Sequence, residues 1–190
     1  ERALGDRSGA IVAVDPLTGE LLAVASSPGF DPNLFSFGLS QVEWNLLRND
    51  TRQPLFNKAL NGIYPPGSTF KLVTAAAALD SGTVTPETIF EDNGTLMVRG
   101  NIIRNFRSES FGEHTFADAV ISSINTTFAK VGLELGHDTL TEYAKRFGFE
   151  GAPKMELPVN KSSVGDLKVS QTELAWASVG QARVVSTPLQ

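Results

Sequence analysis

The sequence predicts a mixed α/β domain of the α+β type, in which an antiparallel sheet accompanies a helical region. Two short apolar runs near the start, residues 9–14 and 20–25, flank the turn-forming segment Asp15–Gly19 and are typical of a β-hairpin. Residues 68–79 are apolar almost all round, as expected of a helix in the core. Capped helical segments then occupy much of the second half of the chain.

The composition is that of one ordinary globular domain and excludes several kinds of site. The 190 residues carry a net charge of −5, so we expect no nucleic-acid partner. The absence of cysteine excludes disulfides and a cysteine nucleophile, and two histidines leave little for a metal site. No apolar run approaches the roughly 18 residues of a membrane span, and the first residues do not resemble a signal peptide. We expect neither a metal nor a cofactor.

The elements of the first half follow from turn and periodicity signals. After the hairpin, residues 26–32 are rich in turn formers and residues 41–48 predict a short helix. The loop Tyr64–Gly67 contains two prolines and leads directly into the helix of residues 68–79, which we expect to end near Gly82.

After residue 82 the sequence predicts short strands and four helical segments. Residues 83–114 indicate short strands with turns at Gly94 and Gly100. The helical segments are residues 116–120 behind a Thr115–Asp118 capping box, 127–135 before Gly136, 139–147 before Gly148, and 171–179 behind Ser170 and Glu173. Ser122–Thr126 favours a break between two helices, because its side chains compete for backbone hydrogen bonds.

Ser68 and Lys71 are the first candidates for chemistry. Residues three apart share a helix face, so hydroxyl and ammonium can meet. Burial favours the neutral form of a lysine, which can then take the proton of a serine nucleophile, while N–H groups at the helix start can stabilise an oxyanion. On this tetrapeptide alone the simpler interpretation is a serine cap and a lysine that extends to the surface, because chance supplies about 0.6 such matches.

Ser123-Ile124-Asn125 is a second candidate, 55 residues after Ser68. Chance supplies about 0.8 matches to this pattern, and a turn between helices explains it equally well. The chain has no P-loop, no His-Glu-x-x-His and no Gly-x-Ser-x-Gly motif. The two motifs in this order therefore carry more weight than either one alone.

Tyr64–Lys71 (Tyr-Pro-Pro-Gly-Ser-Thr-Phe-Lys) followed by Ser123–Thr126 (Ser-Ile-Asn-Thr) resembles the transpeptidase domain of class B penicillin-binding proteins. The similarity runs nearly end to end: residues 9–33 resemble the opening hairpin of the family, and Gly180-Gln181 and Thr187–Gln190 match the approach to its last helices. The resemblance implies the transpeptidase fold shared by penicillin-binding proteins and serine β-lactamases, an antiparallel sheet with a helical subdomain.

The resemblance also implies the roles of four residues. Ser68 would be the acylated nucleophile and Lys71 its general base. Ser123 would relay a proton to the leaving group, and Asn125 would hold Lys71 and the substrate amide; Ser68, Ser123 and Asn125 would thus bind substrate. The reaction of the family opens the D-Ala-D-Ala bond of a peptidoglycan stem peptide and passes the acyl group to an amine of a neighbouring stem. β-Lactam antibiotics mimic the dipeptide and stay attached.

The sequence departs from the family in two places. The Lys-Thr-Gly strand that lines the cleft is absent, since Lys168-Val169-Ser170 does not replace it, and Ala182 stands where the family usually has glycine. Thr187-Pro188 is typical of a helix start, and the helix body is missing. We expect residues 1–190 to be one partial transpeptidase domain, without the Lys-Thr-Gly strand or an N-terminal anchor, completed by strands outside this chain.

The resemblance further implies a setting and leaves two alternatives open. The complete protein would be anchored in the bacterial cell membrane with this domain outside the cytoplasm, would act in cell elongation or division, and would work with a glycosyltransferase. A serine β-lactamase is one alternative, because Glu156–Asn160 fits the Glu-x-x-x-Asn spacing of a deacylation loop, although a solvated loop explains it more simply. A non-catalytic β-lactam-sensing domain is the other.

Other residues are weaker candidates. His114 and His137 lie in segments that resemble loops, so we expect surface or capping roles for them. Trp44 and Trp176 are expected in the core or at an interface, and the phenylalanine-rich segment Phe30–Phe37 is expected to pack.

Overall fold

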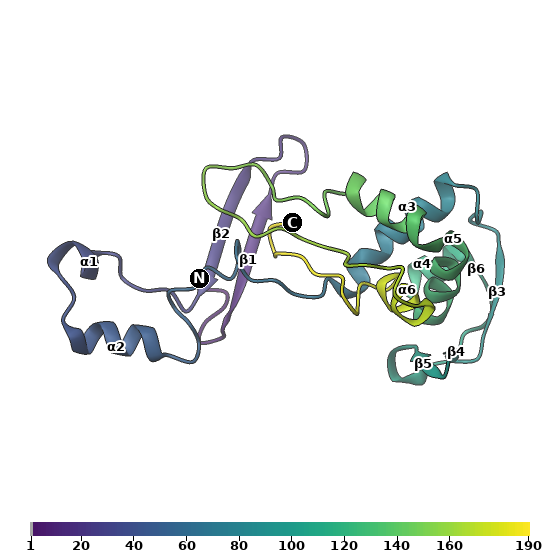
Figure 1. The fold of residues 1–190 in the computed structure, drawn as a ribbon, viewed down its shortest axis with the longest axis horizontal. Helices are drawn as coiled ribbons and strands as arrows, with labels where there is room; N and C mark the ends of the chain where they lie inside the picture. Colours follow the sequence, from purple (N-terminus) through teal and green to yellow (C-terminus); the bar gives the residue numbers. More distant parts are fainter. Residues whose placement is uncertain (1) are drawn as a thin grey trace. The chain divides into compact units, whose positions relative to one another are not determined.

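The computed structural model describes residues 2–190, which form two compact units (Figure 1). The first unit is built from residues 2–64, 153–160 and 187–190, and the second from residues 65–152 and 161–186. Both motifs singled out in the sequence lie within the second unit.

The first unit contains a hairpin and two helices. Its elements are β1 (Gly9–Val14), β2 (Leu21–Ser27), α1 (Asn33–Phe37) and α2 (Gln41–Asn49). β1 and β2 pair in antiparallel fashion, with a register shift between Ala13 and Val14, and are seen as two purple arrows in Figure 1. The Asp15 carboxylate accepts hydrogen bonds from the N–H groups of Leu17 and Thr18, which closes the turn. The predicted hairpin is confirmed, with β2 running to Ser27.

The predicted helix at residues 41–48 is confirmed as α2, and a complete capping box begins it. The Ser40 hydroxyl accepts from the Glu43 N–H, and the Glu43 carboxylate accepts from the Ser40 N–H. The sequence did not reveal α1. The packing role expected for Phe30–Phe37 is wrong for Phe37, which is 89% exposed.

The second unit carries most of the helices. Its elements are the 3₁₀ turn η1 (Gly67–Phe70), α3 (Lys71–Asp80), β3 (Ile89–Asp92), β4 (Thr95–Val98), β5 (Asn101–Arg104), the 3₁₀ turn η2 (Phe106–Ser108), β6 (Gly112–Thr115), α4 (Phe116–Ile121), α5 (Asn125–Arg146) and α6 (Gln171–Ala177). Two antiparallel pairs, β3 with β6 and β4 with β5, account for the short strands predicted between residues 83 and 114. The expected turns at Gly94 and Gly100 have φ values of 82° and 84°.

The helices enclose the hydrophobic core of this unit. α3 packs against α5, and α5 packs against α6. Phe116 and Phe128 lie fully buried with ring centroids 5.6 Å apart, and the Phe70 ring meets the edge of Phe149. The helix predicted at residues 68–79 is divided: Pro66 and the left-handed Gly67 lead into a 3₁₀ turn, so the α-helix begins at Lys71.

The predicted breaks between helices are found. The Thr115–Asp118 capping box begins α4, and Gly136, with φ 75° and ψ 165°, interrupts α5 where the sequence predicts a helix end. α5 begins at Asn125, two residues before the predicted start, and α6 ends at Ala177, two residues before the predicted end. Ser170 caps α6 through the N–H of Glu173.

His114 occupies a different position from the one expected. It lies on β6 and is buried, with Nδ1 2.8 Å from the carbonyl oxygen of Gly112 and Nε2 2.8 Å from the Thr127 hydroxyl. A carbonyl oxygen can only accept, so Nδ1 donates to Gly112. The expected surface role is therefore wrong, because His114 joins β6 to Thr127 of α5.

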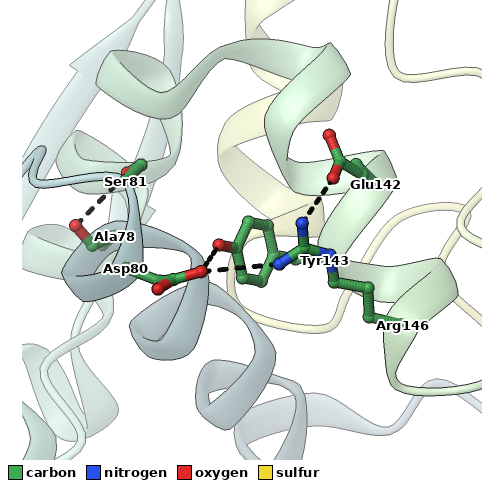
Figure 2. Close-up of polar contacts among 6 residues, drawn as sticks. All are labelled: Ala78, Asp80, Ser81, Glu142, Tyr143 and Arg146. Atoms are coloured by element: carbon green, nitrogen blue, oxygen red, sulfur yellow. Dashed lines mark hydrogen bonds and ion pairs between the residues drawn. The ribbon is translucent and has the colours of Figure 1, made fainter.

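A polar cluster joins the end of α3 to the second part of α5 (Figure 2). The Tyr143 hydroxyl donates to the Asp80 carboxylate, and the Arg146 guanidinium lies 4.4 Å from the Tyr143 ring centroid. Arg146 also reaches Asp80 at 3.4 Å and Glu142 at 2.7 Å. The charged members are largely exposed, so each ion pair contributes little stability. The cluster links Asp80, the last residue of α3, to Tyr143 and Arg146 of α5.

Close packing of α5 on α6 depends on Gly132. A Cβ at this position would overlap the Oγ and Cβ of Ser178. We expect the overlap to cost about 1–3 kcal/mol, and alanine to gain roughly 1 kcal/mol over glycine in a helix, so Gly132→Ala should lower the free energy of unfolding by up to about 2 kcal/mol. Urea denaturation measures this loss. A double-mutant cycle with Ser178→Gly, which opens the space, should show a favourable coupling; strictly additive losses would contradict the overlap.

Candidate active site

Four segments of the second unit carry the predicted site residues. Ser68 lies on η1, and Lys71 is the first residue of α3. Ser123 lies in the turn between α4 and α5, and Asn125 is the first residue of α5. The turn that the sequence predicts between the two helices thus delivers two side chains to the start of α3.

Lys71 is the centre of this arrangement. Its Nζ donates to the carbonyl oxygen of Ser123 at 2.7 Å, to the Ser123 Oγ at 2.9 Å and to the Asn125 Oδ1 at 2.6 Å. Three acceptors match the three N–H bonds of an ammonium group. The side chain does not extend to the surface, because the residue is 4% exposed and its Nζ lies 5.4 Å from the Phe128 ring centroid.

The surroundings of Lys71 are polar but uncharged. No carboxylate is among the hydrogen-bond partners of its Nζ within residues 2–190. Burial lowers the pKa of Lys71 from its usual 10.5 to about 8. A lysine in this state exchanges a proton near neutral pH, which is the property that a general base requires.

Ser123 has a strained backbone. Its φ is 54°, a left-handed conformation that residues other than glycine seldom adopt. The neighbouring Ile124 is 1% exposed and its N–H donates to the carbonyl oxygen of Ala119, so packing holds the turn in place. This conformation directs both the hydroxyl and the carbonyl oxygen of Ser123 to Lys71. Strain of this kind is characteristic of functional sites.

The Asn125 amide is held at both ends. Its Oδ1 accepts from Lys71, and its Nδ2 donates to the carbonyl oxygen of Arg104, on β5, at 2.9 Å. Because an ammonium only donates and a carbonyl only accepts, these two partners determine which way the amide points. The hairpin of β4 and β5 therefore takes part in orienting the site.

Ser68 is exposed at the start of the helix. Its hydroxyl makes no hydrogen bond within the described part of the chain, so the contact with Lys71 that the spacing permits is not formed here. The loop before it is held tightly: the Gly67 N–H donates to the carbonyl oxygen of Gly180 at 2.9 Å. A Cβ at Gly180 would overlap the carbonyl oxygen of Gly67, so this approach requires glycine.

Sequence reasoning missed Asp92, at the end of β3. The residue is 1% exposed, and its carboxylate accepts hydrogen bonds from Thr126, Gly94, Asn105 and Phe111. Burial acts to raise the pKa of Asp92, but these hydrogen bonds outweigh it and lower the pKa. No local signal identifies this residue, because its partners come from four separate places in the sequence.

The weaker candidates lie elsewhere. Glu156 is exposed and belongs to the first unit, and Ser170, the last residue of Lys168-Val169-Ser170, caps α6. Ala182, at the position where the family usually has glycine, has a left-handed φ of 58°. Residues 2–190 hold no group of three or more histidine, aspartate or glutamate side chains that could bind a metal, and none of their helices has the length and apolar character needed to cross a membrane.

A family model described as the penicillin-binding protein transpeptidase domain matches residues 9–190. The chain belongs to this family. The family match extends over both units. The fold is accordingly the α/β transpeptidase fold.

Known relatives agree with this assignment. The peptidoglycan D,D-transpeptidase MrdA of Acinetobacter baumannii is 35% identical over 98% of this chain, and the chain spans 30% of that relative. The penicillin G acyl-enzyme complex of penicillin-binding protein A from M. tuberculosis is 35% identical, with a TM-score of 0.89 over 96% of this chain and 43% of that one. Penicillin-binding protein PBP2 from Helicobacter pylori, in complex with MreC, is 27% identical, with a TM-score of 0.90 over 100% of this chain and 37% of that one.

The lowered pKa of Lys71 predicts a pH-dependent stability. Between about pH 8 and pH 10.5 the folded state has released the Lys71 proton while the unfolded state retains it. The unfolded state then binds more protons, so the free energy of unfolding rises with pH across this window. Urea denaturation at several pH values should show that the free energy of unfolding of the wild type rises with pH relative to that of Lys71→Met, because methionine has no ionisable group. If the difference in the free energy of unfolding between the wild type and Lys71→Met does not change with pH, the pKa of Lys71 is not lowered in the folded state.

Proposed function

We propose that this chain carries the acylated serine of a peptidoglycan D,D-transpeptidase, and that Ser68, Lys71, Ser123 and Asn125 are its catalytic residues. The observation that carries the proposal is the buried Lys71, held by Ser123 and Asn125 three residues after the exposed Ser68. The names of the relatives and the penicillin G acyl-enzyme of a structural neighbour support the same chemistry.

In the proposed reaction, neutral Lys71 takes the proton of the Ser68 hydroxyl as the oxygen attacks the carbonyl carbon of the D-Ala-D-Ala bond. The new bond joins the Ser68 oxygen to that carbon, and the bond to the leaving nitrogen breaks. The leaving amine receives a proton through Ser123, and D-alanine departs. An amine of a second stem peptide then attacks the acyl carbon, the bond from that carbon to the Ser68 oxygen breaks, and the proton lost by the amine passes through Lys71 back to the Ser68 oxygen.

The hydrogen bonds of Lys71 favour Ser123 as the relay. Of the three acceptors around Nζ, only the Ser123 hydroxyl also carries a proton that it can give. Asn125 has its oxygen committed to Lys71 and its Nδ2 to Arg104, which favours a role in orienting Lys71 and meeting the substrate amide. With a pKa of about 8, about a tenth of Lys71 is neutral at pH 7.

We propose the same setting for the complete protein that the family implies. It would be anchored in the bacterial cell membrane with the transpeptidase domain outside the cytoplasm. A glycosyltransferase would supply its glycan strands, and the complex of the Helicobacter pylori relative with MreC supports a partner from the cell-wall machinery. The Lys-Thr-Gly strand remains a prediction for residues outside this chain.

Covalent labelling by a fluorescent penicillin tests the nucleophile. We expect the full-length protein to be labelled, Ser68→Ala to take no label, and Ser122→Ala, an exposed serine in the neighbouring turn, to be labelled normally. Gel fluorescence with mass spectrometry of the labelled peptide measures the outcome. Label on Ser68→Ala, or none on the wild type, would refute the proposal.

The rate of labelling tests the base. It should rise as pH increases through about 8, because the neutral form of Lys71 takes the proton. Lys71→Arg, which stays protonated, should react roughly 10⁴-fold more slowly. A rate that does not depend on pH between 6.5 and 9, or an unimpaired Arg variant, would exclude this role.

The lifetime of the label separates the alternatives. A transpeptidase keeps the label for hours, whereas a serine β-lactamase releases hydrolysed penicillin rapidly. A β-lactam-sensing domain would be acylated without cross-linking donor and acceptor stem peptides, so product formation by the full-length protein distinguishes it from an enzyme.

A further inference from the structure

We propose that Asp92 is a positioning residue for the Ser123–Asn125 motif, because its buried carboxylate joins the two backbone segments between which the Asn125 amide is held. The inference rests on the proposed function, which makes Asn125 a partner of the general base. Asp92 itself touches neither Lys71 nor Ser68, so it acts through Asn125.

The Asp92 carboxylate has a complete set of donors. Its Oδ1 accepts from the Thr126 hydroxyl at 2.5 Å and from the Gly94 N–H at 3.0 Å. Its Oδ2 accepts from the Asn105 Nδ2 at 2.8 Å and from the Phe111 N–H at 3.0 Å. No lysine or arginine is among these donors, so four neutral donors alone stabilise a charge that is almost fully buried.

Two of the donors to Asp92 lie next in sequence to Asn125 and to its partner Arg104. Thr126 follows Asn125 directly, and Asn105 follows Arg104, whose carbonyl oxygen accepts from the Asn125 Nδ2. The two segments are also joined to each other, because the Thr126 N–H donates to the Asn105 Oδ1 at 3.0 Å. Asp92 therefore connects the start of α5 to the end of β5.

A displacement of either segment would change the Asn125 contact with Lys71, which is 2.6 Å long. That contact favours the ammonium form of Lys71, so its loss lowers the pKa of Lys71 and leaves the amine less well directed. Within the described residues, the hydrogen-bond and ring contacts of Lys71 include no other titratable group. The titration of Lys71 therefore reports on its contacts with Ser123 and Asn125.

The position requires a carboxylate rather than an amide. A carboxylate offers acceptors to all four donors, whereas an asparagine would turn its own N–H₂ group toward two of them. Thr126 can rotate its hydroxyl to accept, but the N–H groups of Gly94, Asn105 and Phe111 cannot. Asp92→Asn should consequently separate the two segments without changing the size of the side chain.

The test compares Asp92→Asn with Glu150→Gln in the full-length protein. Glu150 is a matched control, because its carboxylate also accepts from a hydroxyl and a backbone N–H, those of Ser163 and Val164, and contacts none of the motif residues. Two readouts are measured: the rate of fluorescent penicillin labelling from pH 6 to 10, and the titration of Lys71 by NMR with labelled lysine. Urea denaturation confirms that both variants are folded.

We expect Asp92→Asn to slow labelling about 10- to 100-fold and to move the Lys71 titration to lower pH, whereas Glu150→Gln does neither. On an Asn125→Ala background, Asp92→Asn should add no further loss of rate, because the residue acts through Asn125. An unchanged Lys71 titration in the folded Asp92 variant, or independent additive losses in the double variant, would overturn the proposal.

A second pair keeps the test decisive if Asp92→Asn does not fold. Thr126→Val removes one donor to Asp92 at nearly constant volume and should reproduce the slower labelling and the shifted Lys71 titration. Thr126→Ser keeps the hydroxyl and should label and titrate like the wild type. Equal labelling rates and equal Lys71 titrations in the two Thr126 variants would contradict the inference. If the wild type takes no penicillin label, the proposed function fails, but the Lys71 titration still tests Asp92 separately.

Discussion

The structure of the second unit is organised around one costly interaction, the burial of the Lys71 ammonium group without a countercharge. A charge removed from water must be stabilised by neighbouring dipoles, and here two carbonyl-type oxygens and one hydroxyl serve that purpose. The compensation is incomplete, because the pKa of Lys71 falls to about 8. A carboxylate beside it would hold the proton more firmly and would remove the property that the proposed reaction uses.

The surrounding backbone accepts strain to maintain this arrangement. Ser123 stays in a left-handed conformation because Ile124 is buried beside it, and Gly67 approaches Gly180 more closely than any side chain would allow. Asn125 extends the same arrangement outward to Arg104, and Asp92 joins the segments on either side of that contact. The site thus depends on the β4–β5 hairpin and on β3, although none of the four motif residues lies on a strand.

Two segments singled out in the sequence have different backbone conformations. Ala182 adopts the left-handed backbone for which glycine is suited, which costs roughly 1–2 kcal/mol relative to an unstrained residue. The strain at Ala182 is therefore a local cost in stability. Lys168 and Val169 lie in a turn rather than a strand, and Ser170 caps α6.

Local chemistry in the sequence was sufficient to predict many of the elements. The β1–β2 hairpin, the capping boxes of α2 and α4 and the stop at Gly136 depend on residues within a few positions of one another. The pairing of Ser68, Lys71, Ser123 and Asn125 came from motif order and resemblance. The sequence did not reveal α1, the 3₁₀ turn that carries Ser68, or the buried place of His114.

Only the tertiary structure decided which groups surround Lys71 and what that environment does to its proton. Its acceptors lie more than 50 residues away, and the pKa of a lysine depends on burial and dipoles rather than on its neighbours in sequence. Asp92 could not be found for the same reason, since its donors come from Gly94, Asn105, Phe111 and Thr126. The sequence determined which chemical groups are available, and the packing of α3, α5 and the strands determined which of them meet.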